Sequence, residues 1–234
     1  MMTALLGIDC STDPKKTGLA LGELKNGLVN IIRCDIASKR NPPIRVIDWL
    51  HDFEKVIIAM DAPLGWPKDH GIQLSAHKAG QAIHIKDMNK LFRRMTDVEI
   101  KKRLNKQPLD VGSNLIARTA FAALTLLDQI RQITGQPIPL AWSPNEKDQW
   151  RVIEVYPAAT RIAHGAKDES GCLQGLEEML DCSAVASIVQ TSKDAADAAV
   201  CALAAADFLL GRAVAPKDKE TAYIEGWIWA AQKN

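Results

Sequence analysis

The chain has 234 residues, a formal net charge of +1 and 47% hydrophobic residues. This length fits one large α/β domain, and the hydrophobic fraction is normal for a protein with a sizeable core. The near-zero charge argues against a generally basic surface for nucleic acid, and no apolar run reaches the ~18 residues that span a bilayer. We therefore expect a single domain over residues 1–234 with no membrane anchor.

The cysteine pattern excludes two further classes of protein. The five cysteines are odd in number and form no CxxC pair, which argues against a disulfide framework and a structural zinc site. The first residues lack the basic and apolar regions of a signal peptide. Reduced thiols and the absence of a leader favour a cytoplasmic protein.

The first 61 residues predict three strands, a helix and a fourth strand. Asn26-Gly27 between two apolar runs is a strong hairpin signal. The first and fourth strands each end near an aspartate, Asp9 and Asp61. The predicted strands cover residues 4–10, 19–24, 28–36 and 55–63, and the predicted helix covers 44–53, with Ile44, Ile47 and Leu50 at helical spacing.

The rest of the chain predicts an insertion followed by helices and one more strand. Residues 64–110 are polar and broken by Gly and Pro, so we expect a lid of short helices and loops. The apolar tail at 225–231 fits a helix or a strand equally well. The other predicted elements are helices over 113–134, 157–164, 172–190 and 192–210 and a fifth strand over 150–157.

This order of elements is that of the ribonuclease-H-like fold, whose first and fourth strands lie side by side in the centre of the sheet. We therefore expect an α/β protein with a mixed five-stranded central sheet, flanking helices and a helical insertion after the fourth strand. In that topology Asp9 and Asp61 are neighbours at the carboxyl ends of their strands. Open α/β sheets bind their ligands at this edge.

Two carboxylates held close together predict a divalent cation. They repel each other unless one is protonated or a cation lies between them, and Mg²⁺ prefers such oxygen ligands. The helix at 192–210 adds Asp194 and Asp197 on one face. Asp194 is explained by its place at the helix start, whereas Asp197 among alanines needs a partner or a metal. We therefore prefer Asp197 as the metal ligand and keep Asp194 as the alternative.

A set of three or four carboxylates can hold two divalent ions for phosphodiester hydrolysis. Glu154 inside the fifth strand either faces solvent or supplies a fourth carboxylate. The expected catalytic residues are thus Asp9, Asp61, Glu154 and Asp197, with Mg²⁺ or Mn²⁺ as the cofactor held by Asp9, Asp61, Asp197 and Asp194.

Two segments are candidates for contacts with substrate phosphates. Residues 86–106 contain eight basic and three acidic residues, so Arg93 and Arg94 are expected phosphate ligands, with a solvated helix face as the alternative. Ser11 and Thr12 lie in the polar turn after Asp9. They are turn formers or hydrogen-bond donors to Asp9. The same turn is similar to the phosphate-binding hairpin of actin-like and sugar kinases, which need two copies of the domain, and this chain shows one.

Several strings in this order resemble domain-of-unknown-function family 429, which is described as predicted ribonuclease-H-like nucleases. The strings are GIDCSTDPKKTGLAL, IIAMDAPLGWP, RRMTD, EVYPAATR, DAADAAVCALAA and EGWIW. The resemblance implies the fold and a nuclease activity. It assigns the family's acidic pattern to Asp9, Asp61, Glu154 and Asp197, with Asp194 beside it. It also assigns the family's RxTD element to Arg94, Thr96 and Asp97, which implies that Asp97 faces the substrate.

The residues and the resemblance together predict a metal-dependent nuclease or phosphodiesterase acting on a nucleic acid or a nucleotide. Two alternatives remain open, a binding or regulatory module without turnover and phosphoryl transfer of the kinase type. The identity of the substrate and the oligomeric state, including a dimer, also remain open.

Overall fold

The computed structural model describes residues 3–37, 41–112 and 114–233. The strands are β1 (Thr3–Asp9), β2 (Gly18–Lys25), β3 (Leu28–Ile36), β4 (Lys55–Asp61), β5 (Trp150–Glu154) and β6 (Leu180–Asp181). The α-helices are α1 (Pro42–Leu50), α2 (Lys68–Leu74), α3 (Asn89–Phe92), α4 (Met95–Leu104), α5 (Asn114–Thr134), α6 (Pro157–Ala163), α7 (Ala186–Thr191), α8 (Lys193–Leu209) and α9 (Lys219–Glu225). Two 3-10 turns, η1 (Pro14–Lys16) and η2 (Ser183–Val185), complete the described elements.

The sheet has the strand order β5-β4-β1-β2-β3-β6. Strands β1, β2 and β3 form an antiparallel meander, and β4 and β5 run parallel to β1. This is the ribonuclease-H-like order, so the predicted fold class is confirmed. The predicted sheet lacked β6, which pairs with the edge strand β3 through two residues.

Local signals predicted most elements, with one clear exception. Asn26 and Gly27 have φ values of 53° and 83°, which confirms the predicted hairpin turn. The helix predicted over 172–190 is wrong, because only η2 and α7 are helical there. Gly175 has a φ of 90°, which breaks a helix, and the two residues of β6 pair with β3 instead. Ser113, predicted to begin the long helix, lies outside the described residues.

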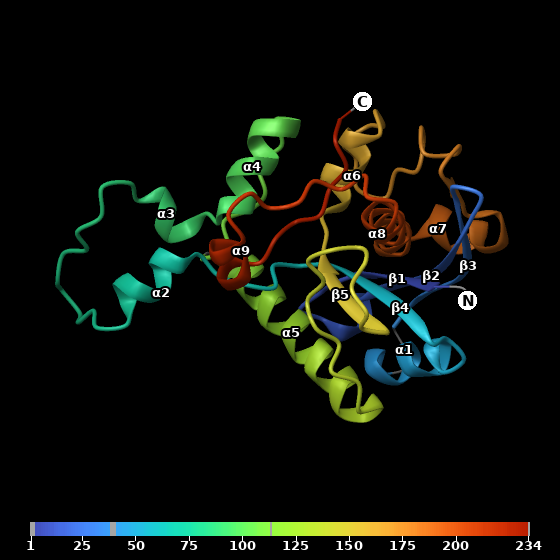
Figure 1. The fold of residues 1–234 in the computed structure, drawn as a ribbon, viewed down its shortest axis with the longest axis horizontal. Coiled ribbons are helices and arrows are strands. Elements are labelled where there is room, and N and C mark those ends of the chain that lie inside the picture. The colour runs from blue at the N-terminus through green and yellow to red at the C-terminus, as the bar shows by residue number, and fades with distance from the viewer. Residues whose placement is uncertain (1–2, 38–40, 113, 234) are drawn as a thin grey trace.

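The core has one layer of helix on each face of the sheet, as Figure 1 shows. Helix α8 covers one face, and α1 and α5 cover the other. Because both faces of β1 and β4 are buried, these strands are continuous apolar runs rather than alternating ones. The helical spacing of Ile44, Ile47 and Leu50 predicted the buried face of α1 only in part. Leu50 is buried together with Val46 and Trp49, whereas Ile44 is 49% exposed.

Helix α8 lies unusually close to the sheet. A Cβ at Gly7 would be 1.9 Å from the carbonyl oxygen of Ala198, and a Cβ at Gly18 would be 2.1 Å from that of Asp194. The helix therefore contacts backbone at two glycines, and its many alanines allow this approach. The consequence is that the first turns of α8 lie beside the carboxyl end of β1.

The insertion between β4 and α5 has two parts. Figure 1 shows α2, α3 and the loop between them projecting from the body. Helix α4 packs against α6 and the tail through Ile100, Leu104, Ala159 and Ile228. The tail continues from α9 as extended chain, and Ile228 forms an isolated bridge with Glu154. None of the helices in the described part of the chain is long and apolar enough to cross a membrane.

Candidate metal centre

Asp9 and Asp61 face each other at the carboxyl ends of β1 and β4. They are paired residues in the parallel register of the two strands, as the topology predicted. Each follows a buried apolar run that fixes its strand in the centre of the sheet. The sheet itself therefore sets the spacing of these two backbone positions, without support from a loop.

The electrostatic environment of this pair disfavours two bare carboxylates. Burial, followed by the charges of Asp61, Asp197 and Asp194, raises the pKa of Asp9 to about 9. Burial, followed by Asp197 and Glu154, raises the pKa of Asp61 to about 8. A proton or a bound cation relieves this repulsion.

Helix α8 brings Asp194 and Asp197 to the pair, but their surroundings differ. Asp197 accepts hydrogen bonds from the guanidinium of Arg161, from Ser170 Oγ at 2.6 Å and from the Gly171 amide at 3.0 Å. The partner that a buried Asp197 requires is therefore present in the chain itself. Burial and Asp197 raise the pKa of Asp194, which accepts no hydrogen bond from any described residue. Of the two, Asp194 is the freer carboxylate.

Glu154 lies at the end of β5 inside a buried ion-pair network. Its Oε1 accepts from Arg94 Nη2 at 2.7 Å, and its Oε2 accepts from Arg94 Nη1 at 2.8 Å and from the Leu64 amide at 2.9 Å. Both carboxylate oxygens are therefore engaged. This geometry makes Glu154 an anchor for Arg94, whereas the sequence predicted a fourth catalytic carboxylate.

Arg94 and Asp97 are buried in the same network. Arg94 is 1% exposed, and it also donates to both oxygens of Asp97, with Nη2 to Oδ1 at 2.9 Å, and to the carbonyl of Glu225 at 3.1 Å. These contacts use the five N–H groups of the guanidinium. Burial lowers the pKa of Arg94, but the charges of Glu154 and Asp97 raise it by more, so Arg94 stays charged. Neither residue offers a free group to a phosphate, contrary to the sequence-based expectation.

The network also attaches the insertion to the rest of the fold. Glu225 at the end of α9 accepts from the amides of Lys68 and Met95, at 2.8 and 2.6 Å. Thr96 Oγ1 accepts from the Ile228 amide at 2.8 Å. The insertion is therefore bound at its base to β5 and to the tail, next to the carboxyl end of the sheet.

All three arginines of the basic segment 86–106 have acidic partners within the chain. Arg93 Nε lies 3.0 Å from Asp110, and Arg103 lies 3.8 Å from Glu99. The described part of the segment therefore carries less free positive charge than its composition suggests, which favours the alternative of a solvated face for much of it.

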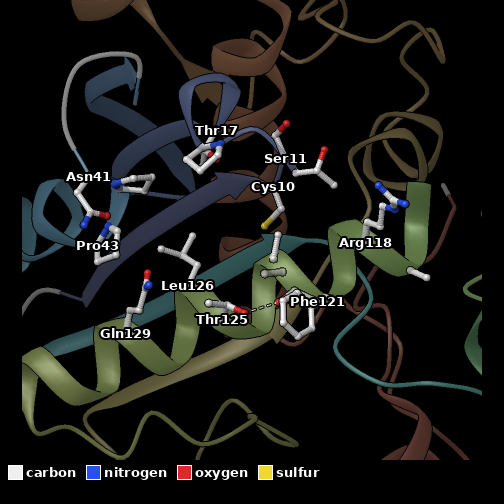
Figure 2. A pocket seen from close by; sticks show the side chains of 16 residues that line it. Cys10, Ser11, Thr17, Asn41, Pro43, Arg118, Phe121, Thr125, Leu126 and Gln129 are labelled. Carbon is white, nitrogen blue, oxygen red and sulfur yellow. Dashed lines mark hydrogen bonds between the residues drawn. The ribbon is translucent and has the colours of Figure 1, made fainter. Parts of the chain in front are cut away.

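Two cavities share Cys10, the residue after Asp9, in their walls. The smaller has a volume of about 260 Å³ and is lined by Asp61, Glu154, Tyr156 and others. Burial and Asp61 raise the pKa of Tyr156 to about 12, so its hydroxyl keeps its proton. The larger has a volume of about 660 Å³ and is lined by Ser11 and Thr12, among others (Figure 2).

Sequence reasoning missed Arg161, Ser170 and Tyr156. Arg161 lies on α6, four residues after the proline that begins that helix, and only folding brings it to Asp197. The EVYPAATR string contains Tyr156 and Arg161 and was a usable signal. In this string Tyr156 follows the end of a strand, and Arg161 lies one turn into the helix that comes next. Both residues therefore lie near the same edge of the sheet.

The residues present fit a divalent cation through two carboxylates. In the described ranges, no three or more His, Cys, Asp or Glu side chains are arranged to hold a metal ion. Mg²⁺ is commonly bound by one or two carboxylates, with waters and substrate phosphates completing its shell. Asp9 and Asp61 match that requirement, and the repulsion between them is what such a cation relieves.

The raised pKa values predict a pH-dependent stability of the metal-free protein. Unfolded Asp61 loses its proton near pH 3.8, whereas the folded protein holds it to about pH 8. Stability therefore falls as pH rises through this window, because the folded state binds more protons. At pH 8, solvent screening limits the effect, and we expect Asp61→Asn to raise the free energy of unfolding by about 1–2 kcal/mol. Thermal unfolding at pH 5 to 8 measures this, and an equal pH dependence in wild type and variant would contradict it.

Comparison with known proteins gives a structural likeness and a family. Among solved structures, T. thermophilus RuvC in complex with Holliday junction substrate is similar, with 13% identity, 89% of this chain and 96% of that chain covered, and a TM-score of 0.38. The fold assignment rests on the strand order rather than on this likeness. The comparison with curated proteins gave no match. The family model described as "Protein of unknown function (DUF429)" matches residues 7–221, which confirms the resemblance seen in the sequence motifs. The chain is therefore a member of the DUF429 family.

Proposed function

We propose that this protein is a divalent-metal-dependent phosphodiesterase whose metal is held by Asp9 and Asp61. The observation that carries the proposal is the pairing of these two aspartates, in register, at the carboxyl ends of neighbouring central strands. Ligands bind at this edge of open α/β sheets. Helix α8 adds acidic groups to the same edge, and the cavity lined by Asp61 gives a substrate access to it.

The donor set supports hard-cation chemistry. Carboxylate oxygens select Mg²⁺ or Mn²⁺ over softer ions. Such a cation supplies stabilisation of negative charge on phosphoryl oxygens and activation of a water for attack. The substrate proposed is therefore a phosphodiester, in a nucleic acid or a nucleotide.

The remaining polar groups have separate parts in this proposal. Asp194 is the third acidic group, because Asp197 is neutralised by Arg161. The Tyr156 hydroxyl keeps its proton and can donate to a phosphate oxygen beside Asp61. Glu154 and Arg94 are positioning residues, since they fix the base of the insertion to the end of β5.

One observation favours the alternative of a binding module without turnover. Two of the four predicted catalytic acids, Glu154 and Asp197, are each paired with a buried arginine. A protein that holds one cation between Asp9 and Asp61 could bind a phosphodiester without cutting it. The experiment below separates the two functions.

The proposal is tested by metal titration and cleavage assays on the same variants. We expect Mg²⁺ or Mn²⁺ to bind wild type by calorimetry, and Asp9→Asn or Asp61→Asn to weaken binding by at least about tenfold, because each removes a charged ligand. Cleavage of DNA, RNA and hybrid substrates with metal should fall by about 100-fold or more in both variants.

Asp52→Asn is the matched control, since Asp52 is an exposed acid beyond the end of α1. It should behave as wild type in both assays. Equal metal affinity in wild type and Asp61→Asn overturns the metal site. Metal binding without cleavage of any phosphodiester overturns the enzyme and leaves the binding module.

A further inference from the structure

The larger cavity lies on the α5 face of the sheet and shares Cys10 with the smaller cavity that Asp61 lines. It begins at Cys10, Ser11 and Thr12, the three residues that follow Asp9, and its opposite wall is helix α5. Figure 2 shows Cys10 and Ser11 opposite that helix. Its volume of about 660 Å³ lies within the range of small-molecule sites, ~300–1,000 Å³. Strand alternation places Asp9 with Gly7 on the α8 face, so a ligand in this cavity on the α5 face approaches the Asp9 carboxylate at the carboxyl edge of the sheet.

Part of the polar lining of this cavity has no partner within the described chain. Four of its polar side chains, Thr12, Asn41, Arg118 and Gln129, form no hydrogen bond or ion pair with the described part of the chain. Among the described residues that line it none is Asp or Glu, although the neighbouring centre is acidic. The charge therefore changes sign between the two sites, which suits a ligand that carries an anion and neutral hydrogen-bonding groups.

Phe121 gives the cavity an aromatic wall. It lies on α5 in the lining, and it is 71% exposed although it is a large apolar side chain. Arg118, one turn earlier on the same helix, is also exposed (Figure 2). An open ring beside an unpaired guanidinium is the combination on which proteins stack bases while they contact the adjoining phosphate.

We infer that this cavity is a nucleoside-binding subsite, in which a base stacks on Phe121 and its phosphate points past Arg118 toward the carboxyl edge of the sheet, where Asp9 and Asp61 lie. The inference rests on the proposed function, because it supplies the part of the substrate next to the phosphodiester. The amides of Asn41 and Gln129 can pair with the base edge, and Thr12 can pair with the sugar. The substrate class is then a nucleotide or single-stranded nucleic acid, because a base within a duplex cannot enter such a cavity without leaving its stack.

A binding experiment without metal and without turnover tests the subsite. The probe is 2-aminopurine riboside, whose fluorescence falls when its base stacks on an aromatic ring. We expect saturable quenching in wild type and affinity about tenfold weaker in Phe121→Ala. The 5′-monophosphate of the probe should bind more tightly than the riboside, and Arg118→Gln should abolish that gain.

Leu115→Ala is the matched control, because Leu115 is equally exposed on α5 but does not line the cavity. Adenosine should displace the probe, whereas ribose and indole should not. The subsite is overturned if there is no saturable quenching, if Phe121→Ala and Leu115→Ala bind alike, or if indole competes as well as adenosine. Probe binding without cleavage of any phosphodiester overturns only the proposed function, and cleavage without probe binding overturns only the subsite.

Discussion

Replacing Arg94 with methionine is expected to lower the free energy of unfolding by about 3–5 kcal/mol. Arg94 is the only cation bonded to Glu154 in the described structure, and both Glu154 and Asp97 are fully buried. Removal of the guanidinium leaves two carboxylates in the interior without their counter-charge. The insertion should also separate from the end of β5, since Arg94 joins them. Urea denaturation followed by circular dichroism measures the loss.

The neighbouring arginine provides the matched control. Arg93 is about one-third exposed and pairs with Asp110, so Arg93→Met should cost less than about 1 kcal/mol. The double variant Arg94→Met/Glu154→Gln should recover part of the loss, because it removes one of the stranded charges. If Arg93→Met and Arg94→Met destabilise the protein equally, the buried ion pairs of Arg94 do not stabilise the fold.

Gly7→Ala is expected to destabilise the protein by about 3 kcal/mol, because overpacking a closely packed interface forces the backbone to shift. The added Cβ would lie 1.9 Å from the Ala198 carbonyl oxygen and 2.7 Å from the Ala202 amide nitrogen. Both obstacles are backbone atoms of α8, so no side-chain rotation relieves them. Helix α8 must move away from the sheet, and Asp194 moves with it.

The same variant therefore tests how α8 contributes to the metal centre. We expect metal affinity measured on the folded fraction of Gly7→Ala to decrease by several-fold, whereas Gly71→Ala should leave it unchanged. Gly71 lies in α2, and a Cβ there meets nothing within 4 Å. Unchanged metal affinity in a destabilised Gly7→Ala would show that Asp9 and Asp61 act without help from α8.

The fold was largely predictable because its signals are local. The buried runs that end at Asp9 and Asp61 and the Asn26-Gly27 turn each fix an element within a few residues. The helix prediction for residues 172–190 failed because the acidic, leucine-containing pattern of this segment fits a helix. Its true structure depends on the positive φ of Gly175 and on pairing with β3, which no local pattern encodes.

Of the candidate site, only the pair of Asp9 and Asp61 was predictable from the sequence. Asp9 and Asp61 follow from strand order, because parallel neighbours bring their carboxyl ends to one edge. The ion pairs of Glu154 with Arg94, and of Asp197 with Arg161, join residues 60 and 36 positions apart. Tertiary packing decides which of these residues meet. Without the two arginines, Glu154 and Asp197 would suit metal ligation equally well.

The sequence by itself determined the ribonuclease-H-like order of elements, the central aspartate pair and the family to which the chain belongs. Both the order and the pair follow from periodicities that repeat over a few residues. The tertiary structure alone decided which acids remain free and that several basic residues of the insertion form internal ion pairs. It also decided that a cavity with an exposed Phe121 borders the residues that follow Asp9. These features depend on which side chains meet after folding. The pKa of an ionisable group likewise depends on its burial and on the charges around it.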